Sequence, residues 1–248
     1  MRKKVNKKLI VALLSFVLLF GGTFGSSLAW LLDTSEDVNN VFTTSDINIE
    51  LKESKLNDDG TLDVNTPVDS NSGYKMIPGW TINKDPKVTV KKDSVACWLF
   101  VKVVETGGVV EYLPSGADEK VESKWSDFLS YTVSDTGISG KTWKELTGDD
   151  AGKLGENEHV YFVEVTDVDS TTKLTKEDIT YSILKDNKVS VKDSVTKEMM
   201  NALTAETYPK LTFTAYAVQY NNSNNTHFAA EEAWKQSAGY VALDPVTP

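Results

Sequence analysis

Few residues in this chain have the types and spacing that catalysis requires. Its 248 residues include two histidines, His159 and His227, and one cysteine, Cys97. The histidines lie far apart in the sequence, and neither belongs to the H-E-x-x-H pattern of zinc proteases. Cys97 lies in the apolar run VACWLFVKVV, where a small buried hydrophobe is expected rather than a nucleophile. No G-x-S-x-G elbow or phosphate-binding loop occurs, so we expect no catalytic residue, metal site or cofactor.

The tryptophans are better candidates for binding. Trp80 follows a Pro-Gly turn, and with Trp125 and Trp143 it is a candidate for an exposed aromatic platform that binds carbohydrate. Packing in the core is the alternative for these three, and it is the expected role of Trp98 and Trp234.

The first 29 residues have the three regions of a secretory signal peptide. A basic start is followed by an apolar run at 9–20, LIVALLSFVLLF. As a helix this run would span about 18 Å, less than the hydrocarbon core of about 30 Å. Small residues then precede an A-x-A-like cleavage site between Ala29 and Trp30. The alternative is an uncleaved anchor, since apolar residues after Ser27 prolong the stretch.

Charge excludes one class of partner. Cleavage after Ala29 removes five of the 26 basic residues and none of the 36 acidic ones, leaving 21 against 36, a formal net charge of −15. Such a surface repels phosphate backbones, so nucleic acid is not an expected partner. Contact with the membrane is expected only through an uncleaved leader.

The remaining residues predict a mostly β domain with a few short helices. Apolar residues alternate with polar ones, or form short β-branched and aromatic runs, in seven segments. These predicted strands are 46–52, 87–90, 95–105, 131–134, 159–166, 180–184 and 210–220. The run at 95–105 is apolar on both alternating faces, as expected in the centre of a sandwich.

Turns and helices complete the prediction. Residues 53–73 predict a long loop or a small hairpin turning at Asp59-Gly60, and Pro78-Gly79 predicts a tight turn. Short helices are expected at 196–206, capped by Ser194, and at 228–237, capped by Thr226 and followed by Gly239.

Several blocks of the chain resemble a known family. The leader ending in GGTFGSSLAW, the following VFTTSDINIEL, the block MIPGWTINKDPKVTVKKDSVACWLFVKV, and LTFTAYAVQY with the later AAEEAW carry this resemblance. They are similar to the TasA/camelysin family of Gram-positive bacteria, whose members are exported through the signal peptidase SipW. The blocks cover about a third of the chain, and the region at about 107–158 matches none of them and is expected to be an inserted lobe.

The resemblance implies a fold and a mode of assembly. It implies a jelly-roll-like antiparallel β-sandwich at 30–248, preceded by the signal-peptide helix, in a protein secreted to the cell surface or biofilm matrix. It also implies fibres in which the freed N-terminal segment donates a β-strand to the next subunit. Carried onto this sequence, the donor region runs from Trp30 to Leu51, and its inward contacts are Val41, Phe42, Ile47, Ile49 and Leu51.

Three functions follow as hypotheses. The first is a structural or interaction protein whose partners are further copies of itself or a related matrix protein, besides the signal peptidase that acts during export. The second is a camelysin-like metallopeptidase, for which the sequence shows no motif. The third is a carbohydrate-binding surface adhesin that uses the exposed tryptophans.

Overall fold

The computed structural model describes residues 32–36, 39–40, 47–172, 174–221 and 226–243. The protein is mostly β, and every ladder between its described strands is antiparallel. The leader and the predicted cleavage site between Ala29 and Trp30 lie outside the described residues.

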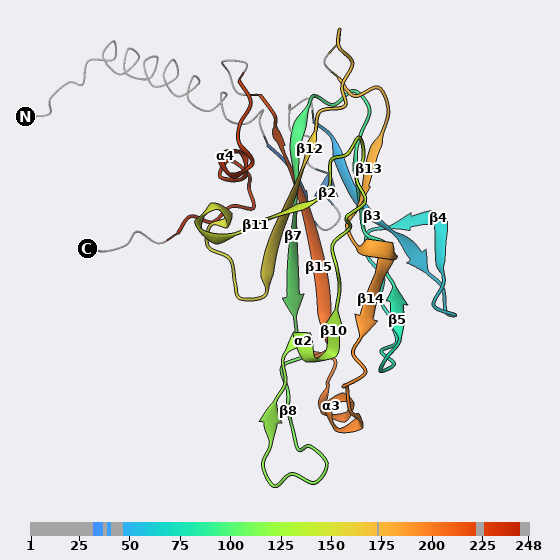
Figure 1. Ribbon diagram of the computed structural model, residues 1–248. Helices are drawn as coiled ribbons and strands as arrows, with labels where there is room; N and C mark the ends of the chain where they lie inside the picture. The colour runs from blue at the N-terminus through green and yellow to red at the C-terminus, as the bar shows by residue number, and fades with distance from the viewer. Residues whose placement is uncertain (1–31, 37–38, 41–46, 173, 222–225, 244–248) are drawn as a thin grey trace, which may run out of the picture.

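One layer of the fold is a six-stranded sheet built around the long strands β7 and β15 (Figure 1). β7 pairs with β15 along its whole length on one edge and with β12 from Cys97 to Val104 on the other. The strands in order across this large sheet are β11 (Lys144–Leu146), β12 (Glu158–Val165), β7 (Cys97–Thr106), β15 (Lys210–Gln219), β1 (Leu32–Glu36) and β2 (Asn39–Asn40).

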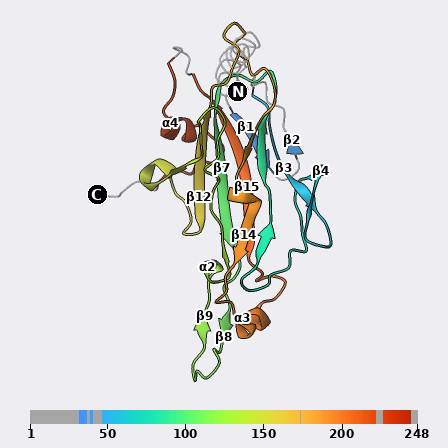
Figure 2. The same cartoon turned by 45° about the vertical axis from the view of Figure 1, so that its right-hand side comes forward.

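Two smaller sheets form the facing layer, and a short hairpin projects from the lower end (Figure 2). The four-stranded sheet has the order β13 (Ile179–Ser182), β6 (Lys87–Val90), β3 (Ile49–Leu56) and β4 (Leu62–Val68). The three-stranded sheet has the order β10 (Leu129–Ser130), β14 (Lys188–Val191) and β5 (Thr81–Asn83), and the hairpin consists of β8 (Glu111–Tyr112) and β9 (Val121–Glu122).

β7 is apolar on both faces because both are covered. Leu99, Val101 and Val103 face the smaller sheets and join the central core cluster with residues of β6, β12 and β13. Trp98 and Phe100 face the opposite side, where they pack with the C-terminal segment around Trp234. This confirms the prediction that the run is a central strand.

The described residues contain three short α-helices, α2 (Trp125–Phe128), α3 (Lys197–Ala202) and α4 (Ala230–Trp234), and two 3-10 turns, η1 (Gly148–Ala151) and η2 (Lys185–Asn187). Both predicted helices exist but are shorter and capped differently. The Thr196 hydroxyl, rather than Ser194, accepts from the backbone N–H of Met199 at 3.3 Å. α4 begins after Ala229, whose N–H donates to the Glu232 carboxylate at 3.2 Å.

The chain beyond α4 packs closely on the outer face of the large sheet. A Cβ placed on Gly239 would lie 2.5 Å from the Trp234 indole and 2.7 Å from the Tyr216 ring. Trp234 is itself buried against Phe100, with ring centroids 5.2 Å apart. The tail and α4 therefore pack together against the outer face of the large sheet.

The region expected to be an inserted lobe is divided between two roles. The β8–β9 hairpin projects from the sandwich beside α3 (Figures 1 and 2). The rest supplies β10, β11 and η1, and its Trp125, Phe128 and Leu146 are buried in the cores.

Candidate functional site

The N-terminal edge of the large sheet is the first candidate site. β1 pairs with the edge of β15 that β7 leaves free, with Leu32 opposite Val218 and Ser35 opposite Ala215. β2 folds back on β1, placing Asn40 opposite Ser35. Without β1, the outward main-chain groups of β15 at residues 215–218 would lose their sheet partners, and such an open edge is a template for another strand.

The structure divides the predicted donor region. Val41 and Phe42 lie outside the described residues. Ile47 and Ile49 are buried in the central core cluster, and Leu51 packs against it. Ile49 and Leu51 also pair with Val90 and Val88 of β6. Because these three residues complete the chain's own sandwich, the N-terminal strand β1, next to the edge strand β2, is the better candidate donor.

Only one of the three predicted platform tryptophans is exposed. Trp80 is 64% exposed, whereas Trp125 is 3% exposed and Trp143 is 7% exposed, so the exposed-platform prediction is wrong for the latter two. Trp125 packs edge-on against Tyr131 with ring centroids 5.9 Å apart, and Trp143 packs against Tyr181 at 5.8 Å. Both indoles fill gaps in the core, as Trp98 and Trp234 do.

Trp80 ends a rigid turn. Its N–H donates to the carbonyl of Ile77 at 3.0 Å, and Gly79 has φ of 77°, which a type II turn requires after Pro78. Gly79 N–H donates to the carbonyl of Val191 at 3.2 Å, and Val191 N–H donates to the carbonyl of Trp80 at 2.8 Å. The predicted Pro-Gly turn is confirmed and is fastened to β14.

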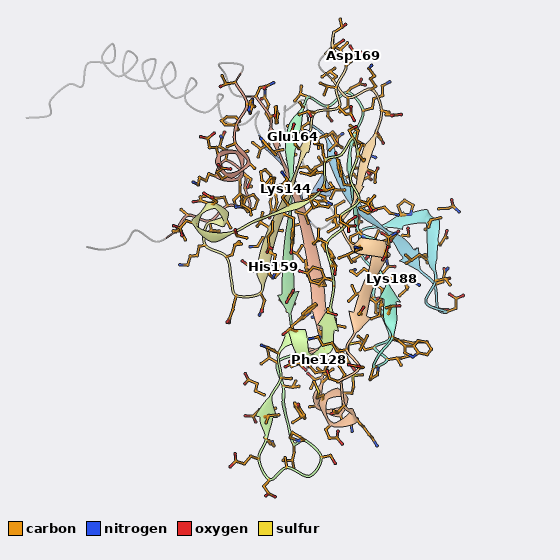
Figure 3. The ribbon with its side chains drawn as sticks, viewed as in Figure 1. Phe128, Lys144, His159, Glu164, Asp169 and Lys188 are labelled. Atoms are coloured by element: carbon orange, nitrogen blue, oxygen red, sulfur yellow. The ribbon has the colours of Figure 1, made fainter. Side chains whose placement is uncertain are left out.

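The two histidines do not meet. Nδ1 of His159 lies 2.9 Å from a carboxylate oxygen of Glu145, and its ring stacks on Tyr161 near the lower part of β12 (Figure 3). His227 stacks on Tyr220, which follows the β15 residue paired with Cys97. His159 pairs with Val103, six residues along β7, so about 20 Å of strand separates the two sites.

Metal-binding and thiol chemistry find no support in the described part of the chain. Within it, no group of three His, Cys, Asp or Glu residues is placed to hold a metal ion. Cys97 is fully buried, and burial raises its thiol pKa to about 12. At neutral pH the thiol is therefore protonated and inaccessible, as expected of a core residue.

A buried polar clamp, absent from the sequence prediction, fastens the second half of β3. Glu53, 6% exposed, accepts from Lys84 Nζ at 2.9 Å, from the Asn71 N–H at 2.7 Å and from the Tyr74 hydroxyl at 3.2 Å. Burial, and then the charge of Glu53, raises the pKa of Tyr74. The clamp therefore surrounds the Glu53 carboxylate with several hydrogen-bond donors at the edge of the sandwich.

The neighbouring residues extend this clamp. Asp85, 1% exposed, accepts from the Ser54 N–H at 2.8 Å, from the Ser54 hydroxyl at 2.7 Å and from Lys87 Nζ at 2.7 Å. Burial alone would raise the pKa of Asp85, but the hydrogen bonds from Lys87 and Ser54 outweigh it and hold that pKa below its usual value. The partners of β3 in the clamp come from segments at 71–74 and 84–87, so the clamp ties β3 to both segments. In the sequence, the alternating Lys and Glu residues of β3 resemble a solvated strand. No sequence signal therefore distinguishes the clamp residues from solvent-exposed ones.

Comparisons with known proteins add no relative. No protein-family model, curated protein or solved structure matches this chain. Among the described residues, no helix combines the length and apolar character needed to cross a membrane. Function is therefore inferred from the geometry of the chain itself.

Proposed function

We propose that this chain is an exported structural protein of the TasA/camelysin type, which assembles at the Gram-positive cell surface or matrix by exchanging its N-terminal strand. The sandwich is then a jelly-roll-like fold, and the leader at 1–29 is an export signal that is removed. The partners are further copies of the chain or a related matrix protein.

The position of β1 carries this proposal. Cleavage between Ala29 and Trp30 would make Leu32, the first residue of β1, the third residue of the mature chain. β1 is thus a terminal strand near the edge of a sheet, paired with β15 over four residue pairs and with the two-residue strand β2. A terminal strand with so few pairs can leave its edge without unfolding the core.

Exchange between copies would conserve these pairs. When β1 of a second copy pairs with β15, the main-chain hydrogen bonds of residues 215–218 are made by the neighbour instead of by the chain itself. The free β1 of the first copy can pair with a third chain. Head-to-tail addition that does not close into a ring produces a filament.

Truncation tests the proposal. We expect the mature chain 30–248 to form filaments visible by electron microscopy and a variant lacking residues 30–43 to remain a folded monomer by circular dichroism and size-exclusion chromatography. The core residues Ile47 and Ile49 are retained in this variant, so its fold is preserved. Filaments formed by the truncated chain would contradict strand exchange.

A cysteine pair provides the matched control. Asp33 pairs with Ala217, and opposite residues in antiparallel strands have Cα atoms about 4.5–5.5 Å apart, within the range of disulfides. In Asp33→Cys/Ala217→Cys, oxidation before assembly should lock β1 in its own chain and prevent filaments. Oxidation after assembly should link neighbouring chains into a ladder on non-reducing gels. Filaments that give no ladder would contradict exchange through β1.

A further inference from the structure

Trp80 differs from the four other described tryptophans in its polar contacts. The buried indoles each donate their Nε1–H to a backbone carbonyl at 2.9 Å: Trp98 to Phe228, Trp125 to Lys210, Trp143 to Ser182 and Trp234 to Ala151. Within the described residues, the Trp80 indole N–H has no such acceptor, and its ring is 64% exposed. A large apolar face and one hydrogen-bond donor are therefore both available to a ligand.

The Trp80 backbone is fixed before any ligand arrives. The turn of residues 77–80 is closed by its own hydrogen bond and joined to Val191 by two others. An anchor on a rigid turn loses less conformational entropy on binding than one on a flexible loop. The Trp80 side chain therefore extends from a fixed point on the surface, immediately before strand β5 of the three-stranded sheet.

Three hydroxyl residues lie on the outer face of the sheet that begins after this turn. Ile82, Val189, Val191 and Leu129 face the core, so the residues that alternate with them face solvent. Thr81 lies opposite Ser190, which in turn lies opposite Ser130, placing three hydroxyl residues in a row across β5, β14 and β10. Lys188, on the same face, is exposed on β14 (Figure 3).

Groups of both charges adjoin the turn. Lys192 and Asp193 follow Val191, and Asp193 Cβ lies 3.8 Å from the position that a Cβ on Gly79 would occupy. Hydrogen-bond donors and acceptors therefore lie next to an apolar ring, and neutral sugars need both.

We propose that Trp80 binds a neutral polysaccharide, with one sugar ring stacked on the indole and the polar side chains beside the turn as its hydrogen-bonding partners. Of the residues in the turn, only Ile77 adds an exposed large apolar side chain. A stable protein interface needs about 800 Å² per partner, so this patch is too small to favour a protein as the ligand. The formal charge of −15 at 30–248 disfavours an acidic polysaccharide.

This site is independent of strand exchange, because Trp80 belongs to the turn before β5 and β1 belongs to the large sheet. Trp80→Ala should therefore leave filament formation unchanged. A polysaccharide site would let the protein attach to glycans of the surface or matrix whether or not it polymerises.

Affinity electrophoresis tests the site on the mature chain. Native gels would contain hydroxyethyl cellulose, laminarin, soluble starch or dextran, with polygalacturonate as the acidic comparison. We expect at least one neutral polysaccharide to retard the protein, Trp80→Ala to weaken that binding about tenfold or more, and Trp80→Tyr to retain part of it. Tyr208→Ala removes another exposed aromatic residue, 49% exposed, and should bind like the unaltered chain.

Two outcomes would overturn the site. The first is retardation by none of the neutral polysaccharides, whether or not polygalacturonate retards the protein. The second is equal retardation of Trp80→Ala and the unaltered chain. Because Trp80 is largely exposed, loss of folding is not expected to confuse the comparison, and unchanged circular dichroism of each variant checks this.

Discussion

β7 and β3 are buried by different means. β7 is paired with β15 along its whole length and with β12 from Cys97 to Val104, and it buries apolar side chains on both faces. β3 pairs with β6 through its first half and with β4 through its second, and a register shift between Ser54 and Lys55 separates its last residues from the regular ladder. At that end Glu53 and Ser54 are buried with polar partners. The stability of the protein should therefore be sensitive to side-chain volume at β7 and to side-chain charge at β3.

The contrast follows from the energetics of the two environments. In a close-packed apolar core, a deleted side chain leaves a cavity that the surroundings fill only partly. In the polar clamp, a deleted partner leaves a charge without compensation in a place that water reaches poorly. The first penalty does not depend on pH, whereas the second depends on which carboxylates are ionised.

The largest effect is expected in the centre of β7. Phe100→Ala removes a fully buried ring that packs on Trp234 and Phe162, and should lower the free energy of unfolding by about 4 kcal/mol. Urea denaturation at neutral pH measures this. Leu113→Ala, at an exposed position on the β8–β9 hairpin, is the control and should change it by less than about 0.5 kcal/mol. Equal effects of the two would contradict the assigned core.

A smaller loss is expected when the clamp loses its cation. Lys84→Met leaves Glu53 buried without its ion-pair partner and should lower the free energy of unfolding at pH 7 by about 3 kcal/mol. Lys52→Met breaks the partly exposed pair with Asp69 and should cost less than about 1 kcal/mol. In Lys84→Met/Glu53→Met, part of the loss should be recovered. If Lys84→Met costs no more than Lys52→Met, the clamp contributes little.

The smallest effect is expected in acid, where replacing Asp85 should change how the stability of the protein depends on pH. Since the pKa of Asp85 is lower in the folded protein than in the unfolded chain, its contribution is fully present above about pH 4 and is lost as the pH falls through the folded-state value. Asp85→Asn should therefore reduce the dependence of the urea midpoint on pH below about pH 4. Asp118→Asn, at an exposed position, should leave the curve close to that of the unaltered chain. Parallel curves for all three proteins would show that Asp85 does not contribute.

Sequence patterns predicted the apolar strands well and the polar ones poorly. β6 has the predicted bounds, and β7, β12, β13 and β15 begin and end within two residues of the predictions. These strands carry β-branched and aromatic residues that pack on covered faces, so their composition reflects their environment.

Two strand predictions miss. At 131–134 the chain forms only an isolated bridge between Val133 and Leu184. The other miss comes from the polar clamp. The strand predicted at 46–52 is shifted to Ile49–Leu56, because β3 continues through Glu53 to Lys55, which look solvated in sequence. Their partners Asp85 and Lys84 lie about 30 residues away, at a distance no local pattern encodes. The alternative hairpin reading of 53–73 is confirmed, with Gly60 N–H bonded to the carbonyl of Asn57 at the turn.

The candidate site was predicted only in part. The sequence identified Trp80 but also Trp125 and Trp143, because an indole in a polar segment can either fill a core gap or face water. Burial of Trp125 and Trp143 depends on acceptors far away in the sequence, the carbonyls of Lys210 and Ser182, which accept from their indole N–H groups. The division of the N-terminal region into β1, near the edge of the large sheet, and the core strand β3 was likewise set by pairing with β15 and β6.

Gly239 shows that a glycine can be required for its lack of bulk rather than for its backbone freedom. It does not adopt a left-handed conformation, yet a single added methyl group would collide with both Trp234 and Tyr216. Such a methyl group would act as a wedge that pushes the tail away from the outer face of β15. The close packing of the C-terminal tail, and with it the burial of Phe100 and Trp234 on this side of the large sheet, is therefore set at a position that carries no side chain.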